Sequence, residues 1–372
     1  MSYSLGQGTG PLRGVRIVEV AGIGPGPHAG TLLADLGADV VRVERPGGAG
    51  SAGSRETDLL TRGRPSVAMD LKKPDAVAAV LGLVERADVL IEGMRPGAME
   101  RLGLGPDVCL GRNPRLAYGR MTGWGQHGPL AQAAGHDNNY IALSGALHYA
   151  GAGDVPPVTP PTLVGDLGGG ALYLALGLVS AILHARGGGK GQVIDAAIVD
   201  GSAHMMNLLL DLSAVGLMRE QRGTSVLDGP HWFNTYRCKD GRDITVGALE
   251  GKFYKLLLEK LGLAEDRRFA AQHAAGQWPL QRAAFAELFA MRTRDEWCAL
   301  LEGTDACFAP VLAPSEAAQH PHMKARGTYA RGGGVLQAAA APRFSATPAP
   351  DAPNAIPAVG QHNEEILASL RR

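Results

Sequence analysis

Two stretches of the chain carry side chains suited to moving protons. Gly135-His136-Asp137 places an imidazole beside a carboxylate, and Gly165-Asp166-Leu167 places a lone carboxylate before a long apolar run. An imidazole and a carboxylate brought together across a pocket are able to act as two proton-transfer groups. The residue types leave a structural role equally open, because Asp137 and Asp166 each stand where a helix N-cap is expected.

The immediate neighbours of these residues do not decide between the two roles. Adjacent residues do not share a helix face, so Asp137 is not expected to orient His136 from one turn away. Asp137 is instead expected to cap a helix that begins near Asn139, where free N–H groups also favour an anion. Three glycines follow Leu167. They lose more backbone entropy in a helix than alanine would, which indicates close approach of another backbone or of a ligand.

Other reactive residue types are weaker candidates. Glu250 follows an expected strand at 243–248, a position where an acid is usually solvated. His320-Pro321-His322 lacks the partner cluster that a metal site needs. Ser144 and Ser202 lack a nucleophile elbow. The four cysteines have no CxxC spacing, so we expect reduced, buried thiols in place of a disulfide frame or a metal site.

The elements that position these residues are typical of an α/β fold. Strands are expected at 15–20 and 39–44 with a helix at 28–36 between them, and the alternation continues to residue 120. This pattern predicts a doubly wound parallel sheet. The glycine turn before the helix is not a dinucleotide fingerprint, because Pro27 and His28 stand where its third glycine belongs.

The rest of the chain divides by composition. Residues 167–184 form a nearly uncharged helix that we expect to be buried on all sides, and a strand is expected at 192–197. The small residues of Gly47–Ser54 predict a mobile loop, and 338–357 an extended crossing. Composition changes after Gly223. The domain boundaries that we expect are 1–209 with 311–372 for a large domain, and 210–310 for a smaller α+β domain.

Composition limits the class of protein. The chain has 372 residues, of which 45% are hydrophobic and 19% charged, as in ordinary soluble globular proteins. Positive and negative side chains balance at 36 each, which gives no basic footprint for nucleic acid. We expect no segment to reach the roughly 18 apolar residues of a bilayer span, and the start lacks a signal-peptide core. A cytoplasmic protein with no membrane or nucleic-acid partner is expected.

Four basic residues stand at or just beyond expected strand ends: Arg45, Lys72, Arg95 and Arg101. Ligands of open α/β sheets bind at the carboxyl ends of the strands. Together these residues are placed to hold an extended polyphosphate. Each one taken alone is better explained as a solvated surface charge.

Several motifs resemble the family III CoA-transferase superfamily, and nearly the whole chain takes part. They include Pro11-Leu12-Arg13-Gly14-Val15, Met69-Asp70-Leu71-Lys72, Glu92-Gly93-Met94-Arg95-Pro96-Gly97, Met121-Thr122-Gly123-Trp124-Gly125-Gln126 and Ala341-Pro342-Arg343-Phe344-Ser345. Three further stretches resemble the α-methylacyl-CoA racemase branch: Gly135-His136-Asp137, Gly165-Asp166-Leu167-Gly168-Gly169-Gly170 and Gly247-Ala248-Leu249-Glu250. The transferases generally lack the histidine and carry a glycine-rich loop in the small domain, and no such run follows Gly223 here.

The resemblance implies a fold and an activity. The fold is a Rossmann-like large domain with a parallel sheet plus a smaller α+β domain, in an interlocked homodimer. The activity is that of an isomerase, a racemase that interconverts (R)- and (S)-2-methylacyl-CoA through an enolate. CoA is part of the acyl-CoA substrate, and no cofactor or metal is implied. A CoA transferase with Asp166 as nucleophile and a non-catalytic acyl-CoA-binding member remain alternatives.

The resemblance also implies roles for single residues. His136 and Asp166 serve opposite faces of the α-carbon, so the pKa of Asp166 should lie nearer neutral than that of a free aspartate. Glu250 is expected to act on the partner's active site and to polarise His136. The backbone N–H of Asp137 is the candidate donor to the enolate oxygen. Arg45 and Arg101 are expected on the CoA phosphates, Met69, Asp70, Leu71, Lys72, Gly93, Met94 and Arg95 around its adenosine and ribose, and Met205, Met206 and Leu208–Leu210 either on the acyl tail or in a core helix.

Overall fold

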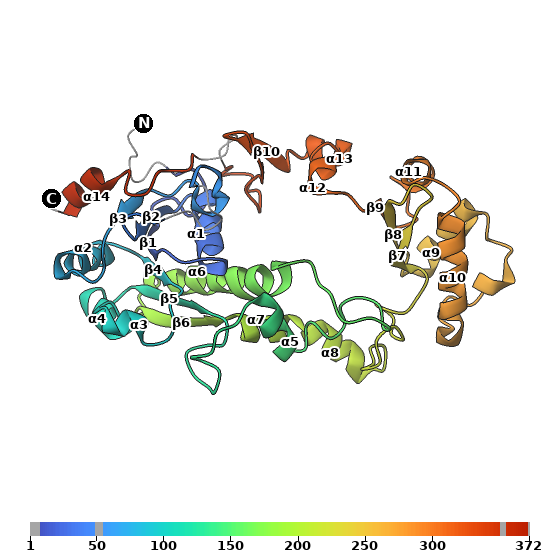
Figure 1. Cartoon of the computed structure of the whole chain (residues 1–372), viewed down its shortest axis with the longest axis horizontal. Coiled ribbons are helices and arrows are strands. Elements are labelled where there is room, and N and C mark those ends of the chain that lie inside the picture. The colour runs from blue at the N-terminus through green and yellow to red at the C-terminus, as the bar shows by residue number, and fades with distance from the viewer. Residues whose placement is uncertain (1–7, 49–54, 350–354, 371–372) are drawn as a thin grey trace. The chain divides into compact units, whose positions relative to one another are not determined.

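The structure is a computed structural model that describes residues 8–48, 55–349 and 355–370. The chain forms two compact units, each assembled from separate segments (Figure 1). Unit 1 comprises 1–146, 160–205 and 322–372, and unit 2 comprises 147–159 and 206–321. Residues 49–54 of the expected mobile loop and 350–354 of the expected crossing lie outside the described residues.

Unit 1 is built on a six-stranded sheet in the order β3-β2-β1-β4-β5-β6, with every neighbouring pair parallel. Its strands are β1 (Arg16–Val20), β2 (Asp39–Glu44), β3 (Ser66–Ala68), β4 (Val89–Glu92), β5 (Ala117–Thr122) and β6 (Gln192–Ala197). This strand order is that of a doubly wound α/β sheet. The expected α/β class with a parallel sheet is confirmed, and β2 and β6 have the expected limits.

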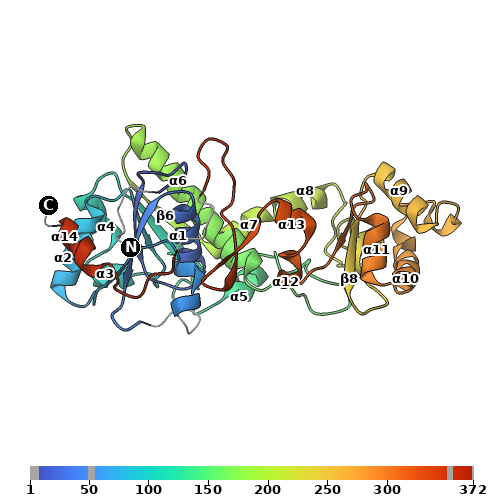
Figure 2. The same ribbon diagram turned by 90° about the horizontal axis from the view of Figure 1, so that it is seen from above.

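Helices cover both faces of this sheet (Figure 2). Successive strand residues point to opposite faces. Ile17 of β1 therefore packs in the core beneath α1 (Pro25–Asp35) and α6 (Leu172–Arg186), and Val18 packs on the other side. The helices on that other side are α2 (Pro74–Val84), α3 (Ala98–Arg101), α4 (Pro106–Arg112) and α14 (Asn363–Leu370).

Helix α1 begins at Pro25, earlier than the expected start at His28. Proline is tolerated in the first turn of a helix, where its missing N–H has no intrahelical partner, so the two prolines here do not extend the turn. Gly24 precedes the helix with φ of 67°, a left-handed conformation that favours glycine.

The long apolar run is a π-helical segment, η3 (Leu163–Ala171), continued by α6. Together they make the one helix of the described residues, Leu163–Arg186, that is long and apolar enough to cross a membrane by length and composition. The expectation that no segment has this length was therefore wrong. Burial on all sides was also wrong, because Leu172, Leu176 and Leu183 are 50%, 65% and 73% exposed. The sheet covers a single face of α6 and leaves an apolar face outside.

The C-terminal segment of the chain covers the β3 edge of the sheet. The Ser66 N–H donates to Nδ1 of His362 (3.2 Å), and the His362 N–H donates to the carbonyl of Ser66 (3.0 Å). The Ala68 N–H donates to Oδ1 of Asn363 (2.7 Å), and the Gly63 N–H to the carbonyl of Ala355 (2.8 Å). An unpaired edge strand is a site for aggregation, and these bonds satisfy much of this one.

Unit 2 holds an antiparallel sheet of β7 (Phe233–Arg237), β8 (Asp243–Gly247) and β9 (Phe308–Pro310). Its core brings these strands together with α9 (Gly251–Leu261), α10 (Trp278–Phe289) and α11 (Arg294–Leu301). The remaining elements are α5 (Asp137–Leu143), α7 (Ile198–Met205), α8 (Asn207–Ala214), α12 (Pro314–Ala317), α13 (Pro321–Ala325), β10 (Tyr329–Gly332) and β11 (Val335–Ala338), with short 3₁₀ turns at Arg55–Thr57, Leu59–Thr61, Arg267–Phe269 and Ala275–Gln277.

Candidate active site

A pocket of about 420 Å³ lies in unit 1 at the carboxyl ends of β1, β4 and β5. β1 and β4 are adjacent in the sheet, and the strand order runs outward from them in both directions. This is the topological switch point at which open α/β sheets bind ligands. Its walls include the turn at 22–24 with the first residues of α1, the Glu92–Pro96 strand end, His136, Tyr140 and Asp166. The structure therefore brings His136 and Asp166, from separate motifs, into one pocket.

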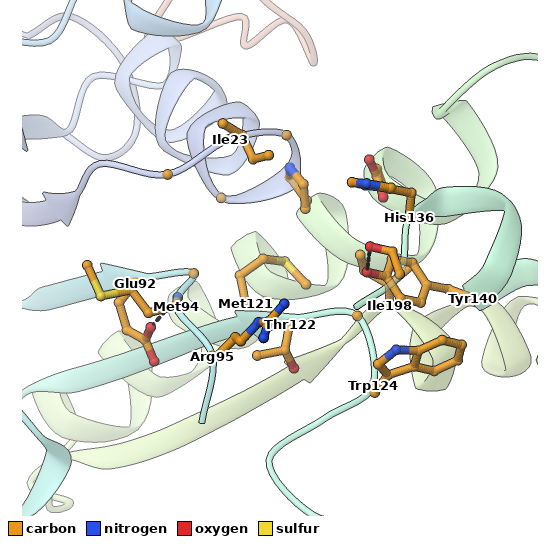
Figure 3. A pocket seen from close by; sticks show the side chains of 18 of the residues that line it. Ile23, Glu92, Met94, Arg95, Met121, Thr122, Trp124, His136, Tyr140 and Ile198 are labelled. Carbon is orange, nitrogen blue, oxygen red and sulfur yellow. Dashed lines mark hydrogen bonds between the residues drawn. The ribbon is translucent and has the colours of Figure 1, made fainter. Parts of the chain in front are cut away.

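His136 is the N-cap residue of α5 and has an extended backbone (φ −137°, ψ 176°). Its N–H donates to Oδ1 of Asn139 at 3.0 Å, which fixes the start of the helix from within. The side chain is exposed and points into the pocket, toward the turn that carries Ile23 (Figure 3). An imidazole held in this way is accessible to a substrate in the pocket.

Asp166 lies inside η3, in its first turn, and is half-buried. The N-cap of this segment is Thr162, so the capping role considered for Asp166 is wrong. The carboxyl faces the start of α1: a Cβ added to Gly24, the N-cap of that helix, would lie 3.5 Å from Oδ2 of Asp166. The pKa of Asp166 is raised to about 6, chiefly by burial and then by the nearby Asp137 carboxylate, while His136 acts to lower it. A group with this pKa gains and loses a proton near neutral pH.

The sequence predicted that Asp137 caps its own helix, and the structure shows that it does not. It is the first residue of α5 and its side chain is buried, 3% exposed, against η3. Oδ1 of Asp137 accepts a hydrogen bond from the Asp166 N–H at 2.6 Å. In a π-helix each N–H bonds to the carbonyl five residues back, and the Leu167 N–H takes the carbonyl of the N-cap Thr162 at 3.1 Å, so the Asp166 N–H is left without an intrahelical partner. Asp137 therefore caps the neighbouring helical segment.

Tyr140 is a pocket residue that the sequence did not single out. Its hydroxyl donates to the carbonyl of Gly135, next to His136, and its ring lies edge-on to Trp124 at 4.7 Å between centroids. Burial raises the pKa of the phenol, and the Asp166 charge raises it further. A side chain at Gly123 would collide with the tyrosine ring. The signal in the sequence was the helical spacing of Tyr140 from His136, one turn along the same helix.

The glycines of η3 permit the close backbone approach that the sequence indicated. A Cβ at Gly169 would lie 2.7 Å from the backbone nitrogen of Ser202, and one at Gly201 would lie 1.9 Å from the carbonyl oxygen of Gly169. Helix α7 therefore packs directly on the backbone of η3. The glycines serve this helix crossing, which sets the position of Asp166 in the pocket wall.

The residues expected around CoA fall into two groups. Gly93, Met94 and Arg95 line the pocket at the end of β4, with Arg95 exposed (Figure 3). The other residues expected around CoA are not among those that line the pocket. They follow strand ends at the same edge of the sheet: exposed Arg45 after β2, Met69 to Lys72 after β3, and exposed Arg101 in α3. Met69 is 7% exposed, so its side chain belongs to the core.

The strand end that carries Gly93 and Met94 is held by a buried ion pair missed in the sequence. Nε of Arg120 donates to Oε1 of Glu92 at 3.0 Å, and the Met94 N–H donates to Oε2 of Glu92 at 2.7 Å. Burial raises the pKa of the Glu92 carboxyl, and Arg120 and the Met94 N–H oppose this. Glu92 and Arg120 lie on adjacent strands, a long-range pairing that sequence spacing does not reveal.

Glu250 lies in unit 2, at the N-cap of α9 after β8, and is exposed. Burial raises the pKa of the Cys307 thiol, and the charge of the Glu250 carboxylate also acts to raise it. Of the residues considered for the acyl tail, Met205 is 39% exposed and packs on Gly168, Leu208 and Leu210 are exposed, and Met206 is buried.

Comparison with known proteins places the chain in a family. The model of CoA-transferase family III matches residues 12–363. The chain is 43% identical to the alpha-methylacyl-CoA racemase of Mus musculus over 96% of this chain and 92% of that protein. It is 42% identical to the alpha-methylacyl-CoA racemase of Homo sapiens over the same shares. A crystal structure of a CAIB/BAIF family protein from Brucella suis superposes with a TM-score of 0.83 at 28% identity, covering 97% of this chain and 100% of the other. The chain belongs to CoA-transferase family III.

Proposed function

We propose that this protein is an α-methylacyl-CoA racemase, an isomerase acting on 2-methylacyl-CoA thioesters. One observation carries the proposal: His136 and Asp166 line the same pocket, and the pKa of Asp166 lies near 6. The racemase relatives at 43% and 42% identity support it. The localisation that we propose is the cytoplasm, with an acyl-CoA as the ligand and neither nucleic acid nor membrane as partner.

The chemistry requires two proton-transfer groups. The hydrogen on the α-carbon of a thioester is weakly acidic because the electron pair left behind moves to the carbonyl oxygen as an enolate. One group removes the proton, and the second returns a proton to the opposite face, which inverts the centre. We assign these tasks to His136 and Asp166, with the roles exchanged for the reverse direction. In each direction, one of the two groups starts deprotonated and the other starts protonated.

The enolate oxygen needs donors where charge develops. The backbone N–H of Asp137 has no hydrogen-bond partner within the described residues and adjoins His136. We keep it as the donor. The nucleotide portion of CoA would extend along the strand ends, with Arg95 nearest the pocket and Arg45 and Arg101 further out. CoA is part of the substrate, so the reaction as proposed needs no additional cofactor or metal.

We further propose that the chain forms a homodimer in which Glu250 of one chain contributes to the pocket of its partner. The exposed leucines of α6 support an assembled state, because a monomeric soluble protein rarely exposes a large apolar patch. We propose the interlocked arrangement, with unit 1 as the large CoA-binding domain and unit 2 as the small domain. Mixing inactive His136→Ala chains with inactive Glu250→Gln chains under refolding should restore part of the activity if the pocket combines both chains. No restoration would contradict that arrangement.

The primary test is exchange of the α-hydrogen of a 2-methylacyl-CoA in D₂O. We expect deuterium to enter at the α-carbon with loss of optical purity, and His136→Ala to lower the rate by about 10²–10⁴-fold. Intact protein that shows no exchange rules out the racemase. An acyl-enzyme that hydroxylamine cleaves would instead indicate a CoA transferase with Asp166 as nucleophile. Arg95→Gln, compared with Arg112→Gln on the far side of α4, should raise KM without lowering kcat to the same extent.

A further inference from the structure

Asp137 presents a carboxylate that the proposed reaction does not explain. The side chain is 3% exposed, although its neighbours His136 and Asn138 are exposed. Oδ1 binds the Asp166 N–H, and Oδ2 is buried without a hydrogen-bond partner among the described residues. A buried polar group without a partner costs free energy, and a carboxylate costs more than a neutral group. A neutral acceptor such as asparagine would make the same hydrogen bond at lower cost.

The surrounding backbone is shaped to accept this carboxylate. A Cβ at Gly165 would lie 2.5 Å from Oδ1 of Asp137, so the contact depends on glycine at this position. Asp137 also continues directly from His136, the cap of α5. One side chain thus ties the helix that carries the imidazole to the segment that carries the Asp166 carboxyl.

Among the charged groups near Asp166, Asp137 has the largest effect on the ionisation of its carboxyl. Helix α7 faces η3 through Gly201 and Ser202, and the start of α1 faces it through Gly24 and Pro25, none of which is charged. The titratable groups that act on Asp166 come from the α5 segment, Asp137 and His136, and the Asp166 charge in turn raises the pKa of Tyr140 on the same helix. Two carboxylates this close oppose each other's ionisation.

We propose that the Asp137 carboxylate is a positioning residue that locks His136 and Asp166 at a fixed separation and favours the protonated form of Asp166. This inference rests on the proposed racemase function and deepens it. The negative charge of Asp137 raises the pKa of Asp166, after burial, toward the value that two-way proton transfer requires. The burial of Oδ2 without a hydrogen-bond partner among the described residues is unfavourable, and it accompanies the placement of a negative charge beside the proton-transfer group of Asp166.

Conservative variants separate charge from geometry. Asp137→Asn keeps an oxygen for the Asp166 N–H and removes the charge, whereas Asp137→Ala removes both. Asn138→Asp, at the exposed neighbouring position, is the matched control, and the Asp137→Asn/Asn138→Asp double variant restores net charge outside the buried site. The titration of Asp166 is followed by NMR of ¹³C-carboxyl-labelled aspartate, assigned with Asp166→Asn, and does not depend on activity.

We expect the Asp166 midpoint to move to lower pH in Asp137→Asn and in the double variant, and to stay in place in Asn138→Asp. Exchange at neutral pH should fall about 10-fold in Asp137→Asn and further in Asp137→Ala. The Tm of Asp137→Asn should be no lower than that of the unchanged protein, because a buried charge is removed. An Asp166 midpoint unmoved in Asp137→Asn overturns the proposal. If the unchanged protein lacks exchange but the midpoint moves as described, the racemase function fails and the role of Asp137 stands.

Discussion

The two units bury their polar groups in different ways. In unit 1, Glu19 on β1 pairs with Arg42 and Arg64, and all three side chains are at most 6% exposed. In unit 2, the core is built of aromatic rings such as Phe285, Phe289 and Trp297, and Nε2 of the buried His231 is hydrogen-bonded to the Tyr254 hydroxyl at 2.8 Å. Ion pairs are expensive to bury, whereas packed rings stabilise directly.

The difference shows where the fold places its fixed charges. Nη1 of Arg64 donates to the carbonyl of Pro27 at 3.1 Å, and Nη2 of Arg42 reaches the carbonyl of Gly22 at 3.4 Å. Both carbonyls belong to residues that line the pocket, Gly22 in the turn before α1 and Pro27 in its first turn. The buried charges of unit 1 therefore hold the pocket wall, whereas in unit 2 the buried Arg294 pairs with the more exposed Glu316 at 2.7 Å.

The largest expected effect comes from breaking one buried partnership in each unit. Arg64→Met leaves Glu19 without one partner, and Phe285→Ala opens a cavity, and each should lower the free energy of unfolding by about 3–5 kcal/mol. Adding Glu19→Leu to Arg64→Met should recover much of the loss, since a buried pair replaced by apolar residues is often neutral. Adding Phe289→Ala to Phe285→Ala should lower the free energy of unfolding further. Urea unfolding followed by circular dichroism measures all four, and a Glu19→Leu/Arg64→Met variant no more stable than Arg64→Met contradicts the comparison.

Acid should destabilise unit 2 through His231. Burial lowers the pKa of His231 to about 3, so the folded state holds it neutral. For a depressed pKa, the stability is fully present above the ordinary value of 6.5 and is lost as pH falls toward 3. The loss by pH 4 is at most about 3 kcal/mol. Tryptophan fluorescence reports it, because Trp232, Trp278 and Trp297 lie in unit 2; His231→Gln should flatten the pH dependence, and an unchanged slope would show that another group is responsible.

Asp166 should have the opposite dependence. Its pKa is raised to about 6 by burial and then by Asp137, so its stability contribution is present below the ordinary value near 4 and lost as pH rises through 6. Asp166→Asn should therefore be more stable than the unchanged protein at pH 8, by about 1–2 kcal/mol after allowance for solvent contact. Thermal unfolding at pH 5 and pH 8 provides the measurement. An equal gain at both pH values would exclude ionisation as its cause.

Tyr140→Phe should have the smallest effect. The ring keeps its contact with Trp124, and the bond from the hydroxyl to Gly135 is lost, at a cost of about 1 kcal/mol. We expect exchange to slow about 5-fold with KM nearly unchanged, because the loss loosens His136 and leaves the CoA contacts intact. Tyr149→Phe, in unit 2, is the control for loss of a phenol. A larger rise in KM than fall in kcat would argue against a role in holding His136.

Much of the unit 1 sheet was predictable because its signals are local. Strand β2 is a short valine-rich segment between a glycine helix stop and Arg45-Pro46, and its limits were as expected. The start of α1 was misplaced because Gly24-Pro25-Gly26-Pro27 has the composition of a turn, although proline fits the first turn of a helix. The β10–β11 hairpin was missed because Gly332-Gly333-Gly334 hid a two-residue turn with positive φ at Gly333 and Gly334.

The sequence anticipated that His136 and Asp166 lie together, but not the contacts that hold them. His136 and Asp166 were expected together through resemblance, and both line one pocket. The capping roles inferred for Asp137 and Asp166 were wrong, because local rules pair a cap with its own helix. Here Asp137 serves a helix that begins far along the chain, and a glycine at 165 makes room for it. Sequence spacing carries no signal for such a contact.

The cover on the β3 edge has a consequence for synthesis of the chain. Ser66 and His362 are separated by 296 positions, so the ribosome makes the edge strand long before its cover. At about 5–20 residues per second, the interval is about 15–60 s, and all of unit 2 is translated within it. Once the strands through β6 have been made, the nascent sheet presents an open β3 edge to other chains until the C-terminal segment follows. Slow translation, or early termination ahead of residue 355, would therefore favour aggregation of chains whose pocket residues are already complete.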